Sequence, residues 1–401
     1  MPHPQGPVRG GPVRGGPGRG GGELSAPRLR GGSPERAGLD PEELRRLVQE
    51  VRDLTAGDRP WASGAVVVAG RGPVLAVAEA AGWAVRYVAH DPHTGEGVEL
   101  PAHARVPMTV DTPFDLASLT KLFTSVAAVQ QIERGTLGID ARVGAYLPEF
   151  HAAARHDLTV RHLLTHTSGL RPELPLYDCA DDTERLALLR AEEPAGAPGT
   201  YRYSDLNMLL LQHVLERVTG RPLDVLVRDG ITRPLGMTST RFGPCPGAAA
   251  TEDQRRPWAK ADRGMLRGQV HDENAWALGG VAGHAGLFAT APDLAVFCRA
   301  LLTGGSYGPA RILGPDFVEL LLTPPGLGFA MDQPWFMGEL AGRGAAGHTG
   351  FTGTSLVLDR ATDTFLVLLA NTVHPRRRPP DSRPRAAAAT RMARAVRTRP
   401  S

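Results

Sequence analysis

The stretch Val110-Asp111-Thr112-Pro113-Phe114-Asp115-Leu116-Ala117-Ser118-Leu119-Thr120-Lys121 leads from an extended segment into a helix. We expect this helix to run from about Ser118 to Glu133 and to stop near Gly135. Ser118 and Lys121 are three positions apart, so they share one face of the helix. At the helix start, free N–H groups and the positive end of the dipole favour an oxyanion. The stretch therefore predicts a serine and a lysine side by side at a helix N-terminus.

This serine and lysine have the chemistry of a nucleophile and its base. The dipole field and burial both disfavour an ammonium, which predicts a lowered pKa for Lys121. A neutral lysine beside the Ser118 hydroxyl would be a nucleophile–base pair. The chain has two lysines, Lys121 and Lys260, against 43 arginines. Because arginine does not lose its proton in proteins, a lysine here indicates a task that needs a neutral amine. The alternative is an exposed helix serine and lysine without a catalytic role.

A second motif, Tyr203-Ser204-Asp205, follows the turn segment Pro198-Gly199-Thr200. It precedes a strongly periodic apolar helix that closes at Gly220. Ser204 or Asp205 can cap that helix, and this is the purely structural interpretation. In the functional interpretation, the phenol of Tyr203 lies near a lysine and passes a proton to a leaving group.

A third motif, His348-Thr349-Gly350, is part of the glycine-rich segment Gly347–Thr354. We interpret it as an irregular strand that leads into the apolar run after it. Glycine within a strand often marks the close approach of a ligand to the backbone. Such an edge can donate an N–H to an oxyanion, here from Phe351. The alternative is a simple glycine-rich turn.

In this order, the three motifs resemble those of the serine β-lactamase and penicillin-binding protein superfamily, closest to its class C-like branch. The pattern of that superfamily is S-x-x-K, then Y-x-N, then K-T-G. Further segments that resemble the branch are Phe114–Ala117, Leu163–Leu170, Leu235–Met237 and Val270–Phe288. The resemblance covers roughly residues 40–372.

The resemblance implies a β-lactamase/transpeptidase-like fold and an acyl-enzyme mechanism. Ser118 would attack an amide or ester carbonyl, Lys121 would take the serine proton, and Tyr203 would relay protons. Backbone N–H groups of Ser118 and Phe351 would hold the oxyanion, and water would then release the acyl group. The implied substrate-binding and oxyanion residues are Asp205, His348, Thr349, Gly350 and Phe351.

Two departures from the family pattern bear on the substrate. The lysine of the third motif is His348 here, and a histidine is only partly charged near neutral pH. The asparagine of the second motif is Asp205, which loses an amide donor and gains a negative charge. Both changes weaken the case for an anionic β-lactam. We therefore expect hydrolysis of a peptidoglycan-derived peptide, a D-amino-acid amide or a small ester. A β-lactamase proper and a catalytically weak penicillin-binding or sensor module are the alternatives.

Strand signals lie near both ends of the chain. Gly64–Ala69 and Val74–Ala78 flank a glycine- and proline-containing turn, and Thr354–Leu358 and Thr364–Ala370 flank a polar one. Between them the chain is mostly helical. This pattern predicts an α/β (α+β) fold in which an antiparallel sheet is built from both chain ends and flanked by helices. A mostly helical inserted domain would span about residues 140–300.

The formal net charge of +3 comes from the two ends of the chain. Residues 1–38 hold six arginines and two glutamates, and residues 371–401 hold nine arginines and one aspartate. Composition predicts a disordered tail over residues 1–38, a hydrolase domain over 39–375, and an Arg- and Pro-rich tail over 376–401. Within this last segment, residues 383–397 could form a terminal helix. Arg-rich tails can touch nucleic acid, but we do not expect that to be the function.

Several other classes of function find no support in the sequence. No run of about 18 apolar residues is present, so no membrane span is expected. The cysteines Cys179, Cys245 and Cys298 are far apart and form no metal-type pair. His162 and His166 have a spacing that metals use, but no third ligand accompanies them. We expect no metal and no cofactor, and a small-molecule or peptide substrate.

The N-terminus lacks the pattern of a secretion signal, which makes a cytoplasmic location the default expectation. The sequence predicts no oligomeric state.

Overall fold

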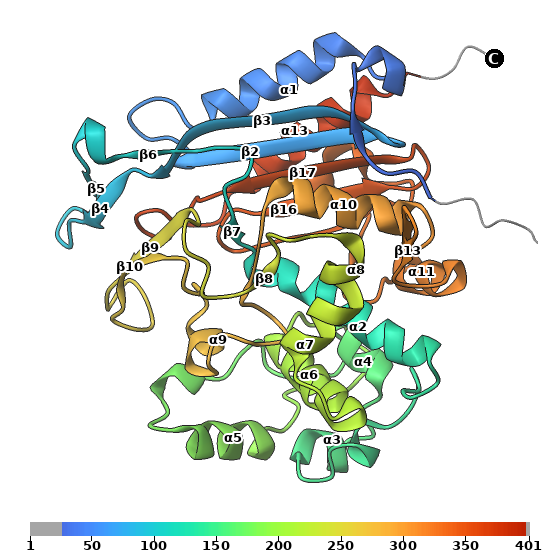
Figure 1. Cartoon of the computed structure of the whole chain (residues 1–401). Helices are drawn as coiled ribbons and strands as arrows, with labels where there is room; N and C mark the ends of the chain where they lie inside the picture. The colour runs from blue at the N-terminus through green and yellow to red at the C-terminus, as the bar shows by residue number, and fades with distance from the viewer. Residues whose placement is uncertain (1–25, 398–401) are drawn as a thin grey trace, which may run out of the picture.

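The computed structural model describes residues 26–397 of the chain. Its main feature is an eight-stranded sheet that joins the two ends of the chain (Figure 1). Strand order is β1-β3-β2-β17-β16-β15-β14, with β6 paired to β3. The strands are β1 Arg30–Gly31, β2 Gly64–Arg71, β3 Val74–Val85, β6 Val106–Pro107, β14 Ala330–Met331, β15 Ala346–Thr349, β16 Ser355–Asp359 and β17 Thr364–Ala370. All pairs in this sheet are antiparallel except β1 with β3. The predicted sheet from both chain ends is therefore confirmed.

The two faces of the sheet carry separate cores because side chains alternate along each strand. On β2, Val66 and Val68 pack into one cluster, while Val67 packs into the other. The second cluster is covered by α1 Pro41–Asp53 and α13 Arg383–Ala395. The first is covered by α10 Ala291–Leu302 and α2 Thr120–Glu133, beyond which lies the helical region (Figure 1). Both faces are thus buried, which holds the sheet between helical layers.

The region predicted to be a helical insertion, residues 140–300, holds seven short or medium helices before α10. They are α3 His151–Arg155, α4 Val160–Leu164, α5 Asp182–Ala191, α6 Asp205–Thr219, α7 Leu223–Val227, α8 Arg233–Leu235 and α9 Glu273–Ala277. Small strands also occur there, and two of them form a three-stranded sheet with a strand that precedes α2. The three-stranded sheet consists of β7 Phe114–Asp115, β11 Leu287–Ala289 and β8 Arg241–Phe242. A separate two-stranded sheet consists of β9 Ala250–Gln254 and β10 Gly264–Arg267.

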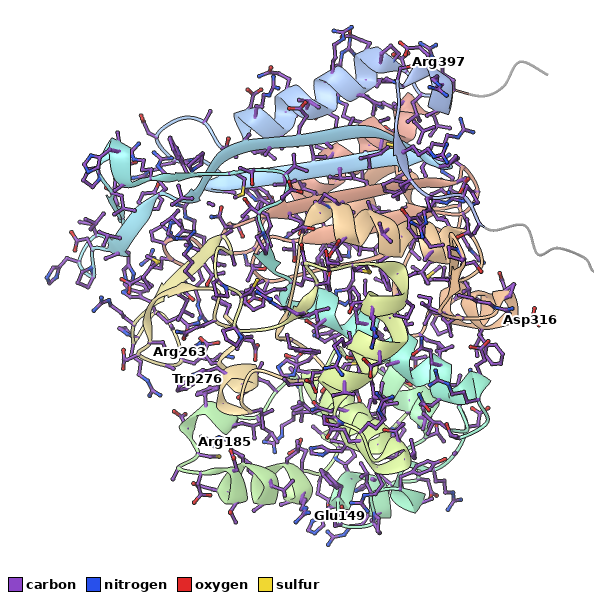
Figure 2. All side chains as sticks on the ribbon, in the orientation of Figure 1. Glu149, Arg185, Arg263, Trp276, Asp316 and Arg397 are labelled. Carbon is purple, nitrogen blue, oxygen red and sulfur yellow. The ribbon has the colours of Figure 1, made fainter. Side chains whose placement is uncertain are left out.

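The remaining elements are short and lie at the edges. They are β4 Tyr87–His90, β5 Gly97–Glu99, β12 Ser306–Tyr307, β13 Ala310–Arg311, α11 Pro315–Leu322 and α12 Pro334–Met337. Figure 2 shows the side chains around the ribbon, with Arg263 beside Trp276, whose ring centroid is 4.7 Å from the guanidinium carbon. None of the helices within residues 26–397 is long and apolar enough to cross a membrane.

At the N-terminal end, the structure differs from the boundary that composition predicts. Residues 26–38 were expected to belong to the disordered tail, but Arg30–Gly31 form β1 at the sheet edge. The N–H of Arg30 donates to the carbonyl oxygen of Pro73 at 2.9 Å. An edge strand needs main-chain hydrogen bonds more than apolar side chains, so composition does not reveal it. The rest of the predicted tail, residues 1–25, lies outside the described residues.

The C-terminal segment also differs from its predicted boundary at residue 375. Arg377 pairs with the buried Glu252 at 2.6 Å, and α13 buries Ala389 and Met392 completely. The guanidinium of Arg397 lies 3.5 Å from the Asp40 carboxylate, beside the start of α1 (Figure 2). The segment predicted as a tail is therefore part of the domain core, and the helix predicted near 383–397 is α13.

The packing of α13 leads to a stability prediction. Replacing the fully buried Met392 by Ala removes apolar contacts with α1 and the sheet, at a cost of about 2–5 kcal/mol. Urea unfolding would measure this cost, with Arg383→Ala as the control because that side chain is 90% exposed. Equal stability of the two variants would contradict the inclusion of α13 in the core.

Candidate active site

The three sequence motifs meet in one cleft of about 980 Å³. Ser118, Tyr203 and His348 line it, each from a different part of the chain. Other lining residues come from the loop before α6, α12, the turn after β15, the segment that leads into α13 and the first turn of α13. They include Tyr201, Trp335, Phe351, Arg378 and Arg385. The cleft thus brings the predicted nucleophile together with residues from both chain ends.

Ser118 lies in a 3₁₀ turn, Ala117–Leu119, directly before α2. The predicted α-helix start at residue 118 is therefore two residues early. Ala117 has a φ of +47°, a left-handed conformation that is strained for a residue with a Cβ. The buried carboxylate of Asp115 holds this turn, since it accepts the N–H of Ala117 at 2.9 Å and that of His271 at 2.6 Å. Asp115 is thus a positioning residue that the motif reasoning missed.

The three residues predicted to be catalytic form one hydrogen-bonded group. The Nζ atom of Lys121 lies 2.7 Å from the Oγ atom of Ser118. The hydroxyl of Tyr203 donates to the same Oγ atom at 2.9 Å. Lys121 Nζ also lies 4.9 Å from the centre of the Tyr203 ring. The serine hydroxyl therefore meets both groups that could exchange protons with it.

Lys121 is charged in the free protein, contrary to prediction. Its side chain is fully buried, which opposes the charge, but Asp205 and then Tyr203 outweigh burial and raise the pKa of Lys121 above its ordinary value. The Asp205 Oδ1 atom lies 2.8 Å from Lys121 Nζ. The predicted lowered pKa is wrong because sequence spacing does not reveal this counter-ion. Asp205 was predicted to contact substrate, but its Oδ1 atom lies against Lys121 Nζ. Ser204 caps α6, as the structural interpretation expected.

His348 is buried and neutral at physiological pH. Burial, and then the charge of Lys121, lower the pKa of His348 to about 4. Its Nδ1 atom lies 2.7 Å from the carbonyl oxygen of Thr349. This contact assigns the proton of the neutral ring to Nδ1 and leaves Nε2 as an acceptor. The partial charge expected of His348 is therefore absent near neutral pH, and it cannot replace the cationic lysine of the family pattern.

Gly350 allows the end of β15 to reach the turn that carries Ser118. A Cβ atom on Gly350 would collide with the Leu116 carbonyl oxygen and with the Thr354 hydroxyl. That hydroxyl donates to the same Leu116 oxygen at 3.0 Å. Thr349 lines the cleft, and the ring of Phe351, half exposed, lies beside it. The oxyanion role of the Ser118 and Phe351 N–H groups remains a prediction.

His166, which has a metal-type spacing from His162 but was not expected to bind a metal, packs against Tyr203. Their rings stack with centroids 4.8 Å apart. The Nδ1 atom of His166 accepts the Ser204 N–H at 3.2 Å and contacts the Asn207 amide at 3.1 Å. Burial, and then Lys121, lower the pKa of His166 to about 3, so it stays neutral. His166 therefore supports the site through hydrogen bonds and ring stacking.

Arg385 is a cleft residue that no sequence signal pointed to, because its segment had the composition of a tail. Its residue exposure is 7%, and its guanidinium donates to the Gly350 carbonyl at 3.1 Å and to the Ser382 hydroxyl at 3.1 Å. Within residues 26–397, no carboxylate lies within 4.0 Å of it and its Nε atom has no hydrogen-bond partner. Burial lowers its pKa to about 10, so it keeps its charge.

One cluster in the site has a spacing that could hold a metal ion. Ligand atoms of Asp205, Asp272 and His284 lie within 4.8 Å of one another. The ammonium of Lys121 already supplies positive charge there, at 2.8 Å from Asp205. The chemistry of this cluster is therefore that of buried ion pairs.

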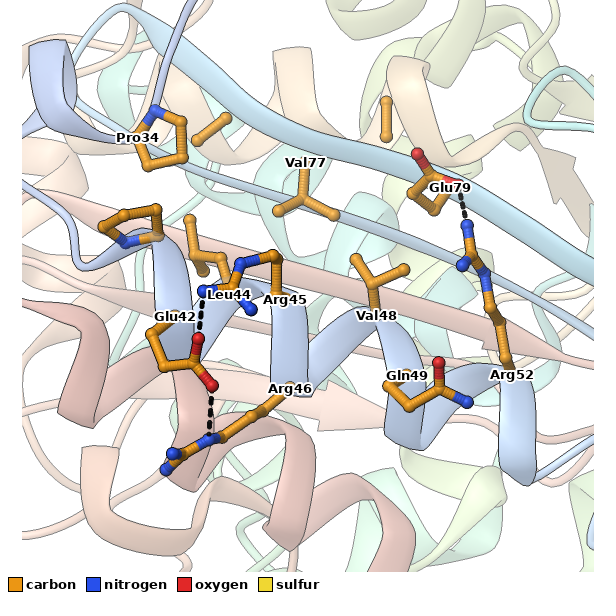
Figure 3. Close-up of a pocket in the computed structure, with 13 residues that line it drawn as sticks. Pro34, Glu42, Leu44, Arg45, Arg46, Val48, Gln49, Arg52, Val77 and Glu79 are labelled. Atoms are coloured by element: carbon orange, nitrogen blue, oxygen red, sulfur yellow. Dashed lines mark hydrogen bonds and ion pairs between the residues drawn. The ribbon is translucent and has the colours of Figure 1, made fainter.

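A second hollow, of about 650 Å³, lies between α1 and β3 (Figure 3). Its charged side chains pair with one another, as Arg46 does with Glu42 at 3.0 Å and Arg52 with Glu79 at 3.2 Å. Among residues 26–397, no serine, cysteine or histidine lines it. It has no nucleophile, and we do not consider it a catalytic site.

Comparison with known proteins identifies the family of this chain. The family model named Beta-lactamase matches residues 44–390. A protein of Escherichia coli strain K12, named "Putative D-alanyl-D-alanine carboxypeptidase", is 31% identical over 389 residues, covering 87% of this chain and 86% of the relative.

Solved structures resemble the fold. A penicillin-binding protein homologue from Caulobacter crescentus has a TM-score of 0.66 at 22% identity, covering 90% of this chain and 99% of its own. A class C β-lactamase from Rhodobacter sphaeroides has a TM-score of 0.64 at 22% identity, covering 88% and 97%. The chain belongs to the Beta-lactamase family and is a serine hydrolase of the β-lactamase and DD-peptidase type.

Proposed function

We propose that this protein hydrolyses an amide or ester through an acyl-enzyme on Ser118, and that its substrate is a peptide ending in a D-amino acid. The observation that carries the reaction is the contact of Ser118 Oγ with both Lys121 and Tyr203 at the floor of an open cleft. A serine within hydrogen-bond reach of a base and a proton relay is the arrangement that acyl transfer requires. The cleft leaves the hydroxyl accessible to a carbonyl carbon.

The reaction divides into two halves. Ser118 Oγ attacks the carbonyl carbon, and its proton passes to Lys121 once that amine has lost its own extra proton. The N–H groups of Ser118 and Phe351 hold the oxyanion, and as the bond to the leaving group breaks, Tyr203 gives its proton to that group and takes the proton held by Lys121 in its place. Water then attacks the acyl carbon, and Ser118 regains its proton.

The substrate class is supported by the charge of the cleft. Neutral His348 offers an acceptor at Nε2, which suits an N–H or O–H group of the substrate. Arg385 offers a buried cation that forms no ion pair within 4.0 Å among the described residues, which suits the terminal carboxylate of a peptide. The name of the Escherichia coli relative is in line with such a substrate.

A β-lactamase proper and a penicillin-binding sensor would use the same nucleophile. They differ from the proposed peptidase in the lifetime of the acyl-enzyme. A β-lactamase would release the opened antibiotic quickly, whereas a sensor would keep it on Ser118. The deacylation rate with penicillin therefore separates the three functions.

Replacing Ser118 by Ala should abolish hydrolysis of an activated ester, because it removes the attacking oxygen. We expect a loss of about 10³-fold or more in kcat/KM, with the thermal midpoint close to that of the wild type. The matched control is Ser239→Ala, because Ser239 is exposed and does not line the cleft, and this variant should keep the wild-type rate. Hydrolysis by the Ala variant at the wild-type rate would overturn the proposed mechanism.

Replacing Arg385 by Met should weaken binding of substrates that carry a terminal carboxylate. A charge-assisted hydrogen bond contributes about 1.5–3 kcal/mol, so KM should rise about 10- to 100-fold. The same peptide with a C-terminal amide should be unaffected, and Arg383→Met should change neither substrate because that arginine is exposed. An equal KM change for the acid and the amide would rule out Arg385 as the carboxylate contact.

A further inference from the structure

Lys121 is fully buried and its ammonium is surrounded on several sides. Asp205 Oδ1 lies 2.8 Å away, Ser118 Oγ 2.7 Å away and the carbonyl oxygen of His284 3.3 Å away. Two of these neighbours, the carboxylate and the carbonyl, can only accept hydrogen bonds from Nζ. The environment therefore favours a protonated lysine and fixes its direction toward Ser118.

A second ion pair lies beside the first. The Nε2 atom of His284 lies 2.9 Å from Asp272 Oδ1. Burial opposes the charge on His284, but Asp272 and then Asp205 outweigh it and raise the pKa of His284. Two acids, Asp205 and Asp272, thus lie beside two buried bases, Lys121 and His284, in one partly buried cluster. Titratable groups from four parts of the chain face Lys121. Tyr201, Tyr203 and Asp205 lie in the segment that opens α6, and Asp272 and His284 lie in the loops around α9. His166 follows α4, and His348 lies on β15.

A charged lysine cannot act as a base. An ammonium has three donors and no lone pair, so it can donate to Ser118 but cannot take the serine proton. Lys121 must first lose a proton before the serine can be activated. Asp205 opposes that loss, because its carboxylate attracts only the charged form. The asparagine of the family pattern carries no charge, so this control depends on the aspartate of this chain.

We propose that Asp205 is a positioning residue that acts through Lys121: its carboxylate fixes the ammonium beside Ser118 and sets the pH at which the lysine becomes the base. This inference rests on the proposed acyl-enzyme reaction. The base forms when Nζ releases one proton to the solvent of the cleft. Nζ then accepts the proton of Ser118 as its oxygen bonds to the carbonyl carbon, and later returns that proton toward the leaving group. Activity should therefore rise with pH above neutrality.

Replacing Asp205 by Asn tests the proposal because it keeps the shape and removes the charge. Burial then acts on Lys121 without its strongest opposing charge, which favours the neutral amine. We expect the acidic limb of the kcat/KM profile to shift to lower pH by about one unit or more. At a given pH on that limb, the fraction of enzyme with a neutral Lys121 would then be about tenfold larger. Asp205→Glu keeps the charge and should leave the limb near its wild-type position.

The profile should be measured with a neutral ester, so that Arg385 takes no part, and Ser118→Ala gives the background rate. The chain provides a matched control in its other lysine, Lys260, which pairs with Glu173 at the surface. Glu173→Gln removes an equal charge from an exposed lysine pair and should not move the limb.

A limb that stays in place in Asp205→Asn while KM rises would mean that Asp205 contacts substrate. A uniform loss without a shift would mean that it only maintains structure. Either result overturns the proposal.

A second measurement needs no substitution in the active site. With ¹⁵N-labelled lysine, the chain should give two Nζ signals, and Lys260→Arg identifies the one from Lys121. In the wild type, Lys121 should remain an ammonium at neutral pH and lose its proton at the pH of the kinetic limb. A neutral amine at neutral pH would refute the inference. It would leave the acyl-enzyme reaction intact, because Ser118→Ala tests that reaction separately.

Discussion

The contact between the buried ammonium of Lys121 and the Asp205 carboxylate requires that distant parts of the chain meet. Burying a charge costs several kcal/mol, and that cost is offset only when partners with good geometry surround it. The partners of Lys121 come from the turn before α2, from the first residue of α6 and from the loop that precedes β11. A shift in any of these elements would leave a buried charge without compensation. The ion pair thus links the helical region to the segment that carries the nucleophile.

The sheet fixes the opposite wall of the cleft. The strand that bears His348, β15, pairs with β14 and β16, and β17 connects these C-terminal strands to β2 and β3 from the N-terminal part. Gly350 lets that strand touch the Leu116 carbonyl, and Arg385 donates to the Gly350 carbonyl from the start of α13. The nucleophile, the strand edge and the last helix therefore form one connected set of contacts. This connection explains why the C-terminal segment, despite its tail-like composition, belongs to the site.

Much of the fold and of the reactive group could be predicted from the sequence. Apolar runs flanked by turn residues identified β2 and β17, and the spacing of Ser118 and Lys121 placed their side chains together. Motif order then associated Tyr203 with that pair, and the structure brings it to 2.9 Å. The charge states could not be predicted in this way. The neutrality of His348 and the charge of Lys121 depend on burial and on neighbours far along the chain. Arg385 and β1 were missed because a packed arginine and an edge strand leave no mark on local composition.

The most direct test of the account is the intact mass of the protein after brief exposure to a fluorophosphonate, followed by peptide mapping. The account predicts a single adduct on Ser118, formed faster as the pH rises because the Lys121 base becomes available, and absent in Ser118→Ala. An adduct on another residue, or none on folded protein, would contradict the assignment of Ser118 as the nucleophile.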